Sequence, residues 1–160
     1  WHGGYNVSWL SGSAPVAPSA VPNSRGEIPK ELSVEEISLL IKAYGQAADL
    51  CAQAGVDVLE VQTSSDYLLG AFLSPLLNRR TDAYGGSAVR RRQIVREVLE
   101  AVRKRAGCEI AVGIRTSLAH ETPGAPSDYD VVQSLEMVSS LFHEGLLDFV
   151  SLSSGTYRKF

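Results

Sequence analysis

The sequence predicts an α/β protein built around a parallel β-sheet. Three apolar repeats with helical spacing alternate with three short β-branched runs, in the order α-β-α-β-α-β. Helices of this length between strands imply parallel pairing through right-handed crossovers. Both a doubly wound sheet and part of a (β/α)8 barrel fit that order. The chain has no Gly-x-Gly-x-x-Gly and no P-loop motif. A whole barrel takes about 250 residues, so the 160 residues would supply roughly half of one.

The composition describes one domain with one hydrophobic core, since 44% of the residues are hydrophobic and 21% are charged. The net charge of −3 argues against a nucleic-acid-binding surface, which is typically basic. No apolar run reaches the roughly 18 residues of a membrane span, and no secretory signal opens the chain. Two cysteines without a Cys-x-x-Cys pair suit reduced thiols, so we expect a cytoplasmic protein. The chain starts with Trp1 and has Met137 as its one methionine, so we expect a fragment.

Residues 1–32 are rich in Gly, Ser, Pro and Asn without a sustained period, which predicts a loop-rich arm. Alternating helices and strands are expected over 33–160. The first helix begins with Ser33 and Glu36, which have the spacing of a capping box, and it ends at Gly55. The β-branched run at 56–61 follows as the first strand.

The connection over 62–87 is long and contains several large apolar residues. Loops longer than about 12–15 residues are usually functional or disordered, and this one is too apolar for disorder, so we expect it to carry function. Four further elements follow: a helix over 88–106, a strand over 110–115, a helix capped near Ser127 and Asp130 that ends at Gly145, and a strand over 147–152.

In both architectures ligands gather at the carboxyl ends of parallel strands. Three polar residues stand at these ends: Gln62, Arg115 and Ser153. Alternation places Glu60 and Gln62 on one face of the first strand, and Gly113 and Arg115 on one face of the second. A glycine before Arg115 leaves room for something planar and electron-rich. Arg115 would bind such a ligand, or it would form a structural ion pair with Glu60 or Asp148.

The connection over 62–87 also carries the most specific motifs of the chain. They are Tyr67-Leu68-Leu69, Phe72-Leu73-Ser74-Pro75, Asn78, Arg80-Thr81-Asp82 and Tyr84-Gly85-Gly86-Ser87. These motifs closely resemble the Old Yellow Enzyme family of FMN-dependent oxidoreductases. Three other segments resemble the ends of that family's third, fifth and sixth strands: Trp1-His2, Gly113-Ile114-Arg115 and Ser153-Ser154-Gly155. The resemblance runs in order over nearly the whole chain.

The resemblance implies the central half of a (β/α)8 TIM barrel that binds FMN. It implies that FMN is reduced by NADH or NADPH and reoxidised by an organic acceptor such as an activated alkene. In the family, the tyrosine that matches Tyr67 donates a proton to the substrate carbon opposite the hydride. The arginine that matches Arg115 contacts the flavin, where a cation stabilises the anionic reduced form. By its place at a strand end, His2 is a second candidate cofactor-binding residue.

The chain departs from the family at the substrate-binding positions. The family has His, or His and Asn, where this chain has Gln62 and Ser65. Both are neutral hydrogen-bond donors, and charged donors are worth roughly twice as much, so we expect weaker polarisation of an enone. Asp66 replaces a small uncharged residue. It would add a negative charge beside the pocket and suit an amine substrate, unless it points to solvent.

We therefore expect an oxidoreductase with a small-molecule substrate, no nucleic-acid or membrane partner, and a second copy of the chain as a candidate partner. No metal site is expected, because the short Asp/Glu/His spacing of such sites is absent. Two alternatives stay open. One is a flavin-dependent amine dehydrogenase or demethylase of the same fold, and the other is a non-catalytic truncated remnant with a structural or interaction role.

Overall fold

The central sheet has three parallel strands in the order β3-β4-β5. These strands are β3 (Val58–Gln62), β4 (Ala111–Thr116) and β5 (Phe149–Leu152). The computed structural model describes residues 4, 14–23, 26–118 and 131–153. The parallel sheet predicted from the sequence is confirmed, although each strand begins one or two residues later than its predicted range.

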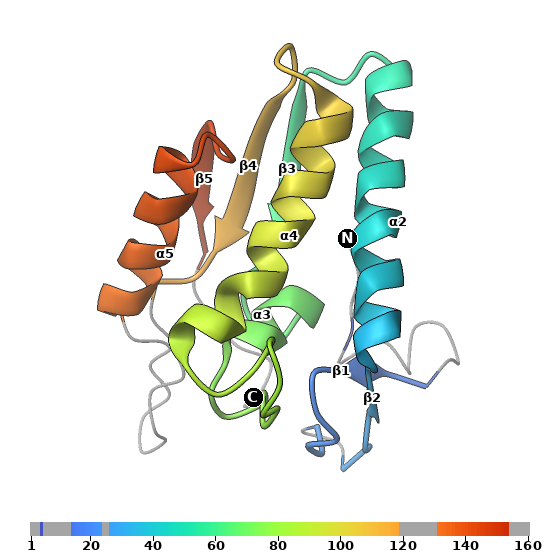
Figure 1. Ribbon diagram of the computed structural model, residues 1–160, viewed down its shortest axis with the longest axis vertical. Coiled ribbons are helices and arrows are strands. Elements are labelled where there is room, and N and C mark those ends of the chain that lie inside the picture. Colours follow the sequence, from blue (N-terminus) through green and yellow to red (C-terminus); the bar gives the residue numbers. More distant parts are fainter. Residues whose placement is uncertain (1–3, 5–13, 24–25, 119–130, 154–160) are drawn as a thin grey trace.

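Three long helices cover one face of this sheet (Figure 1). They are α2 (Val34–Gln53), α4 (Ala88–Ala106) and α5 (Val131–His143). The predicted capping box opens α2: the Ser33 hydroxyl accepts from the Glu36 N–H at 3.2 Å, and the Glu36 carboxylate accepts from the Ser33 N–H at 2.9 Å. The residues proposed to cap the third long helix, 127–130, lie outside the described residues.

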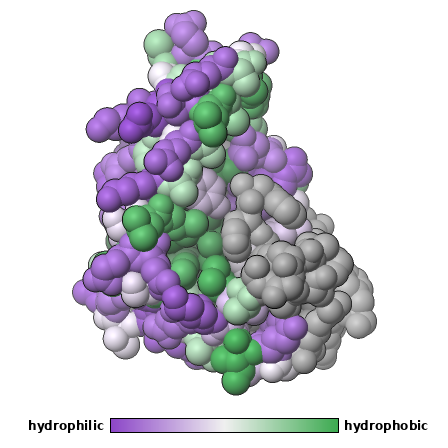
Figure 2. Space-filling model, turned by 90° about the vertical axis from the view of Figure 1, so that its right-hand side faces the viewer, coloured by the Kyte–Doolittle hydropathy of each residue, from purple (hydrophilic) through white to green (hydrophobic). Residues whose placement is uncertain are grey.

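The hydrophobic core lies between these helices and the sheet. Apolar side chains of α4 and β4 form its fully buried centre: Ile94, Val95, Val98, Leu99, Val112 and Ile114. The side of the molecule toward α2 also exposes apolar surface between charged residues (Figure 2). Among the apolar side chains of these elements, Leu39 and Leu50 of α2 are 62% and 65% exposed, and Val58 at the start of β3 is 54% exposed.

The loop over 62–87 and the arm over 1–32 contain elements that the sequence analysis missed. The loop holds a short helix, α3 (Leu68–Leu73), and the arm holds a parallel pair of two-residue strands, β1 (Val16–Ala17) and β2 (Lys30–Glu31). Ala17 of β1 packs with Ala71 of α3 in a small second core. Strands of two residues carry no recognisable period, and six helical residues are fewer than two turns, so pattern reading does not detect them.

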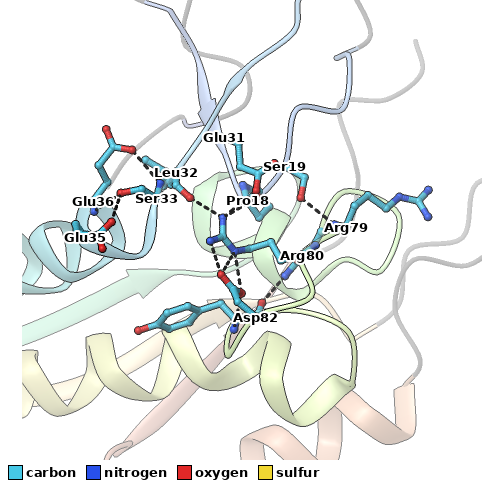
Figure 3. A network of polar contacts seen from close by, with 12 residues as sticks. Pro18, Ser19, Glu31, Leu32, Ser33, Glu35, Glu36, Arg79, Arg80 and Asp82 are labelled. Carbon is cyan, nitrogen blue, oxygen red and sulfur yellow. Dashed lines mark hydrogen bonds and ion pairs between the residues drawn. The ribbon is translucent and has the colours of Figure 1, made fainter.

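A buried guanidinium joins the arm to the loop (Figure 3). Arg80 is 8% exposed, and its Nη1 donates to the carbonyls of Pro18 at 2.9 Å and Leu32 at 2.6 Å. Its Nε and Nη2 donate to the Asp82 carboxylate at 2.5–3.1 Å. Glu31 of β2 lies 3.5 Å from Nη1 and adds a second negative charge. The motif residues Arg80 and Asp82 therefore stabilise the fold by joining the arm to the loop.

Two further residues tie the loop to the helices. Asn78 donates from Nδ2 to the carbonyls of Phe72 and Tyr84, each at 2.7 Å. Arg91, 9% exposed, donates to the carbonyls of Leu73 at 2.9 Å and Gly86 at 2.5 Å. Carbonyl dipoles thus satisfy this buried arginine near the start of α4. Together these contacts fix α3 at the carboxyl end of the sheet.

Replacing Arg80 should destabilise the protein strongly. Arg80→Ala leaves the Asp82 carboxylate and two carbonyls without their donor, so we expect a loss of about 3 kcal/mol in the free energy of unfolding. Arg79→Ala is the matched control, because the Arg79 side chain is exposed and points away from this network (Figure 3). It should change the free energy by less than about 0.5 kcal/mol. Urea denaturation of the intact protein measures both, and equal effects would contradict the role given to Arg80.

The Asp82 pair should also make stability depend on pH. The hydrogen bond from Arg80 lowers the pKa of the Asp82 carboxyl, although partial burial opposes this. The stabilisation is therefore complete above the unfolded-state pKa of about 3.9 and is lost as the pH falls through the lower folded-state pKa. Asp82→Asn should be less stable than wild type at pH 7, and the difference should shrink below about pH 4. Urea titrations at several pH values test this, with the exposed Asp57→Asn as control.

Candidate functional site

Polar side chains line the face of the sheet that the helices leave uncovered. Val61 of β3 is 6% exposed and faces the helices, so alternation turns Glu60 and Gln62 to the opposite face. The register places Gln62, Arg115 and Ser151 side by side on the three strands. One row toward the amino ends, Glu60 stands beside Gly113, which stands beside Phe149. The predicted alternation is confirmed, and it brings six positions of three strands together.

Arg115 forms the ion pair that the sequence left as one of two alternatives. Its Nε donates to Glu60 Oε1 at 2.6 Å, and the Ser151 hydroxyl donates to Glu60 Oε2. Asp148, the other candidate partner, instead pairs with Arg103 at 2.6 Å. Within the described part of the chain, the two terminal Nη groups of Arg115 form no hydrogen bond. The ion pair therefore leaves most donors of Arg115 for a ligand.

The electrostatics keep Glu60 ionised. Partial burial acts to raise the pKa of the Glu60 carboxyl, but the hydrogen bonds from Ser151 and Arg115, together with the Arg115 charge, lower it overall. The Arg115 and Glu60 side chains are 43% and 29% exposed. Ion pairs this exposed to solvent contribute little to stability.

Phe149 fills the space beside Gly113 in which a planar ligand was expected from the sequence. A Cβ built on Gly113 would lie 2.6 Å from the edge of the Phe149 ring. The expectation that Gly113 leaves room for an external planar group is therefore wrong at this position. The glycine instead accommodates an aromatic ring of the neighbouring strand. A cofactor beside Arg115 would bind toward the carboxyl ends of the strands.

Gln62 uses its amide oxygen within the turn, so its NH2 group is the end that can donate to a ligand. Its Oε1 accepts from the Ser64 hydroxyl at 2.8 Å and from the Ser64 N–H at 3.3 Å. Because a backbone N–H only donates, these contacts fix which end of the amide is the oxygen. Thr63, fully buried, donates from both N and Oγ1 to the Arg115 carbonyl, at 2.8 and 3.0 Å. Thr63 and Ser64, which the sequence analysis did not single out, therefore hold Gln62 and Arg115 in place.

The turn after β3 contains a backbone conformation that non-glycine residues rarely adopt. Ser65 has φ +56°, and among the described residues it is the one non-glycine with a positive φ. Such conformations cost free energy and concentrate at functional sites. A Cβ on Gly70 of α3 would collide with the carbonyl oxygens of Ser64 and Ser65. Only glycine at position 70 lets α3 pack this closely on the turn.

The remaining predicted site residues flank this turn, except one. Asp66 is 1% exposed, so the alternative that it points to solvent is wrong. Tyr67 occupies the N-cap position of α3, is half-buried, and does not use its side chain as a cap. His2, the second predicted cofactor-binding residue, lies outside the described residues. Gln62, Ser65, Asp66 and Tyr67 thus form one continuous segment beside Arg115.

The family of the chain follows from a comparison with known sequences. The model of the NADH:flavin oxidoreductase/NADH oxidase family matches residues 2–153. The chain belongs to this family. An NADPH dehydrogenase of Clostridium acetobutylicum is 37% identical over 156 residues, which are 96% of this chain and 44% of that protein. The chain therefore spans less than half the length of this curated relative.

Solved structures of the family have the same fold. Old Yellow Enzyme from Pichia sp. AKU4542 superimposes with a TM-score of 0.81 at 28% identity, over 95% of this chain and 45% of that one. Histamine dehydrogenase from Rhizobium sp. 4-9 superimposes with a TM-score of 0.82 at 29% identity, over 97% of this chain and 23% of that one. The predicted partial (β/α)8 barrel and the predicted family are therefore confirmed.

The residues at the carboxyl ends of the strands fit a flavin nucleotide. The hydroxyls of Ser117 and Ser153 are buried and have no hydrogen-bond partner among the described residues. Buried polar atoms without a partner are costly, and a ligand rich in hydroxyl and phosphate oxygens would satisfy them. Ser117 and Ser153 would hold such a group together with Arg115. Among the described residues, no group of three side chains suits a metal ion.

Gly113→Ala should displace the Phe149 ring. The added methyl group would lie 2.6 Å from that ring, so we expect a loss of about 1–3 kcal/mol in the free energy of unfolding. Combining it with Phe149→Leu should recover part of this loss, because the smaller side chain vacates the space. Urea denaturation of both single variants and the double variant gives the coupling energy. Strictly additive effects would show that the two positions do not share this space.

Proposed function

We propose that the protein containing this chain is an FMN-dependent oxidoreductase that passes hydride from NADH or NADPH through FMN to a small organic acceptor, such as an activated alkene. The observation that carries the proposal is the arrangement at the carboxyl ends of the strands: Arg115, whose Nη donors bond no described residue, lies beside the donor segment from Gln62 to Tyr67. The family match supports the cofactor and the reductant. FMN, when bound, supplies the hydride chemistry.

Each proposed site residue has a separate role. Arg115 places a cation beside the flavin and stabilises negative charge there. The Gln62 NH2 group and the Ser65 hydroxyl donate hydrogen bonds to a substrate oxygen. Tyr67 holds the proton that the substrate carbon receives. Asp66 lies between Ser65 and Tyr67 and makes the segment more negative. His2 is proposed as a further cofactor contact on the basis of its sequence position.

A dehydrogenase or demethylase of amines is the second candidate. Two features of the sequence favour it: the acidic Asp66 stands between Ser65 and Tyr67, and the donors at positions 62 and 65 are both neutral. A carboxylate beside the pocket attracts a cationic amine, whereas neutral donors polarise an enone oxygen weakly. Histamine dehydrogenase is one of the structures similar to this chain. A non-catalytic remnant remains the third candidate, and a colourless preparation of the intact protein without flavin absorbance would favour it.

We also propose a cytoplasmic location and self-association. None of the described helices is long and apolar enough to cross a membrane. Cys51 and Cys108 are both free thiols, as in reducing compartments. Exposed leucines on α2 support contact with a second copy of the chain or with other parts of the protein. We propose that residues 1–160 belong to one barrel domain.

Tyr67→Phe should reduce turnover of the intact protein by about 10²-fold or more, because it removes the proton donor. Flavin content should stay unchanged. Tyr44→Phe is the matched control, since Tyr44 lies on α2 in the helix layer and burial there raises its pKa to about 12. It should leave turnover unchanged. Steady-state kinetics with a cyclic enone and with an amine measure both variants, and full activity of Tyr67→Phe would remove this role.

The double variant Gln62→His, Ser65→His distinguishes the two substrate classes. In an alkene reductase, stronger donors at the substrate oxygen should raise enone turnover, since a single such donor is worth about 10²–10³-fold. In an amine-oxidising enzyme, enone turnover should stay negligible and amine turnover should fall. Side-by-side kinetics with both substrates decide between them. No turnover of either substrate by flavin-loaded wild-type protein would contradict both.

A further inference from the structure

We propose that Glu60 is a positioning residue, which orients the Arg115 guanidinium toward the flavin and is itself held by Ser151. The inference rests on the proposed function, because that function places Arg115 beside the cofactor. It adds two residues, Glu60 and Ser151, to the machinery of the site. Neither was assigned a binding role from the sequence.

The contacts join all three strands through one carboxylate. Glu60 of β3 accepts from Arg115 of β4 with Oε1, at 2.6 Å, and from Ser151 of β5 with Oε2. Arg115 and Ser151 are direct register partners, and Glu60 lies two residues before Gln62, their neighbour on β3. The Glu60 carboxylate therefore contacts both side chains from the adjacent row on the amino-terminal side. Gly113, the direct partner of Glu60, contributes no side chain to this row, and the Phe149 ring lies over it. The bidentate arrangement leaves the carboxylate little rotational freedom.

The geometry selects which donors Arg115 presents. Glu60 bonds only Nε, and both Nη groups of the planar guanidinium are without a hydrogen bond to any described residue. Thr63 fixes the main chain of the same residue through its carbonyl. Arg115 is therefore held at its backbone and at Nε, and its terminal donors are fixed in direction before a ligand binds. Such preorganisation is what an electrostatic contact to a cofactor requires.

Stability alone does not explain this cluster. The pair is partly exposed, and ion pairs of that kind contribute about 0–1 kcal/mol. Glu60 also compensates the charge of Arg115, so the field at the flavin is weaker than that of an unpaired arginine. Removing the charge while keeping an acceptor should therefore make the site more positive.

The experiment compares four variants of the intact, flavin-loaded protein. Glu60→Gln removes the charge and keeps an acceptor, Glu60→Ala removes both, and Ser151→Ala removes the support of the carboxylate. Asp148→Asn is the matched control, because Asp148 pairs with Arg103 at 2.6 Å outside the row of Arg115 and also accepts from the Val112 N–H at 2.8 Å. The readouts are the flavin reduction potential, the flavin Kd, and hydrogen exchange at Arg115 Nε–H by NMR.

Glu60→Gln should raise the reduction potential, because the less compensated cation stabilises the reduced anionic flavin. Glu60→Ala should speed exchange at Arg115 Nε–H and weaken flavin binding by about tenfold, the scale seen when a residue supporting a ligand contact is lost. Ser151→Ala should also speed exchange at Arg115 Nε–H and weaken flavin binding, but by less than Glu60→Ala does. Asp148→Asn should lower only the free energy of unfolding.

Unchanged potential and flavin affinity in both Glu60 variants would overturn the proposal, and so would a potential that Asp148→Asn shifts equally. If the wild-type protein holds no flavin, the proposed function fails. The exchange measurement then still decides the positioning role: faster exchange in Glu60→Ala supports it, and unchanged exchange overturns it.

Discussion

The parallel register of β3, β4 and β5, with helices on one face only, is the constraint on which the site depends. It sends Val61, Val112 and Ile114 into the helix layer and turns Glu60, Arg115 and Ser151 to the other side. A shift of one residue in any strand would exchange these two sets, because side chains alternate along a strand. Burial of the apolar set therefore fixes the polar set. The Arg115–Glu60–Ser151 cluster is a consequence of hydrophobic packing on the opposite face.

A second framework holds the carboxyl end of the sheet. Arg80, Asn78 and Arg91 donate to backbone carbonyls of the arm, of α3 and of the loop before α4. Each is buried, so each contact satisfies a donor that would otherwise be costly. Arg80 and Asn78 belong to the motifs by which the chain resembles the family. The resemblance thus rests largely on residues that build the platform, while Gln62, Ser65 and Asp66, where the chain departs from the family, stand on it.

The residues that hold the fold are thus separate from those proposed to contact the substrate. The platform tolerates little change, because Gly70 packs directly on the carbonyls of the turn after β3 and Arg80 makes contacts to four residues. Gln62 and Ser65 are half-buried, whereas Asp66 is 1% exposed, so substitution at position 66 is the most constrained of the three. Gln62 and Ser65 lie outside the hydrophobic core, and function can vary at such positions on one scaffold.

The sequence by itself determined the parallel α/β order, the capped start of α2 and the segment proposed to carry the site, because these depend on local periodicity and short motifs. The tertiary structure alone decided which partner Arg115 takes, that Asp66 is buried, and that Phe149 occupies the space beside Gly113. It also revealed β1, β2 and α3, which are too short to have a period. Contacts such as Arg115 to Glu60 join residues 55 positions apart, and only the register of the sheet brings them together.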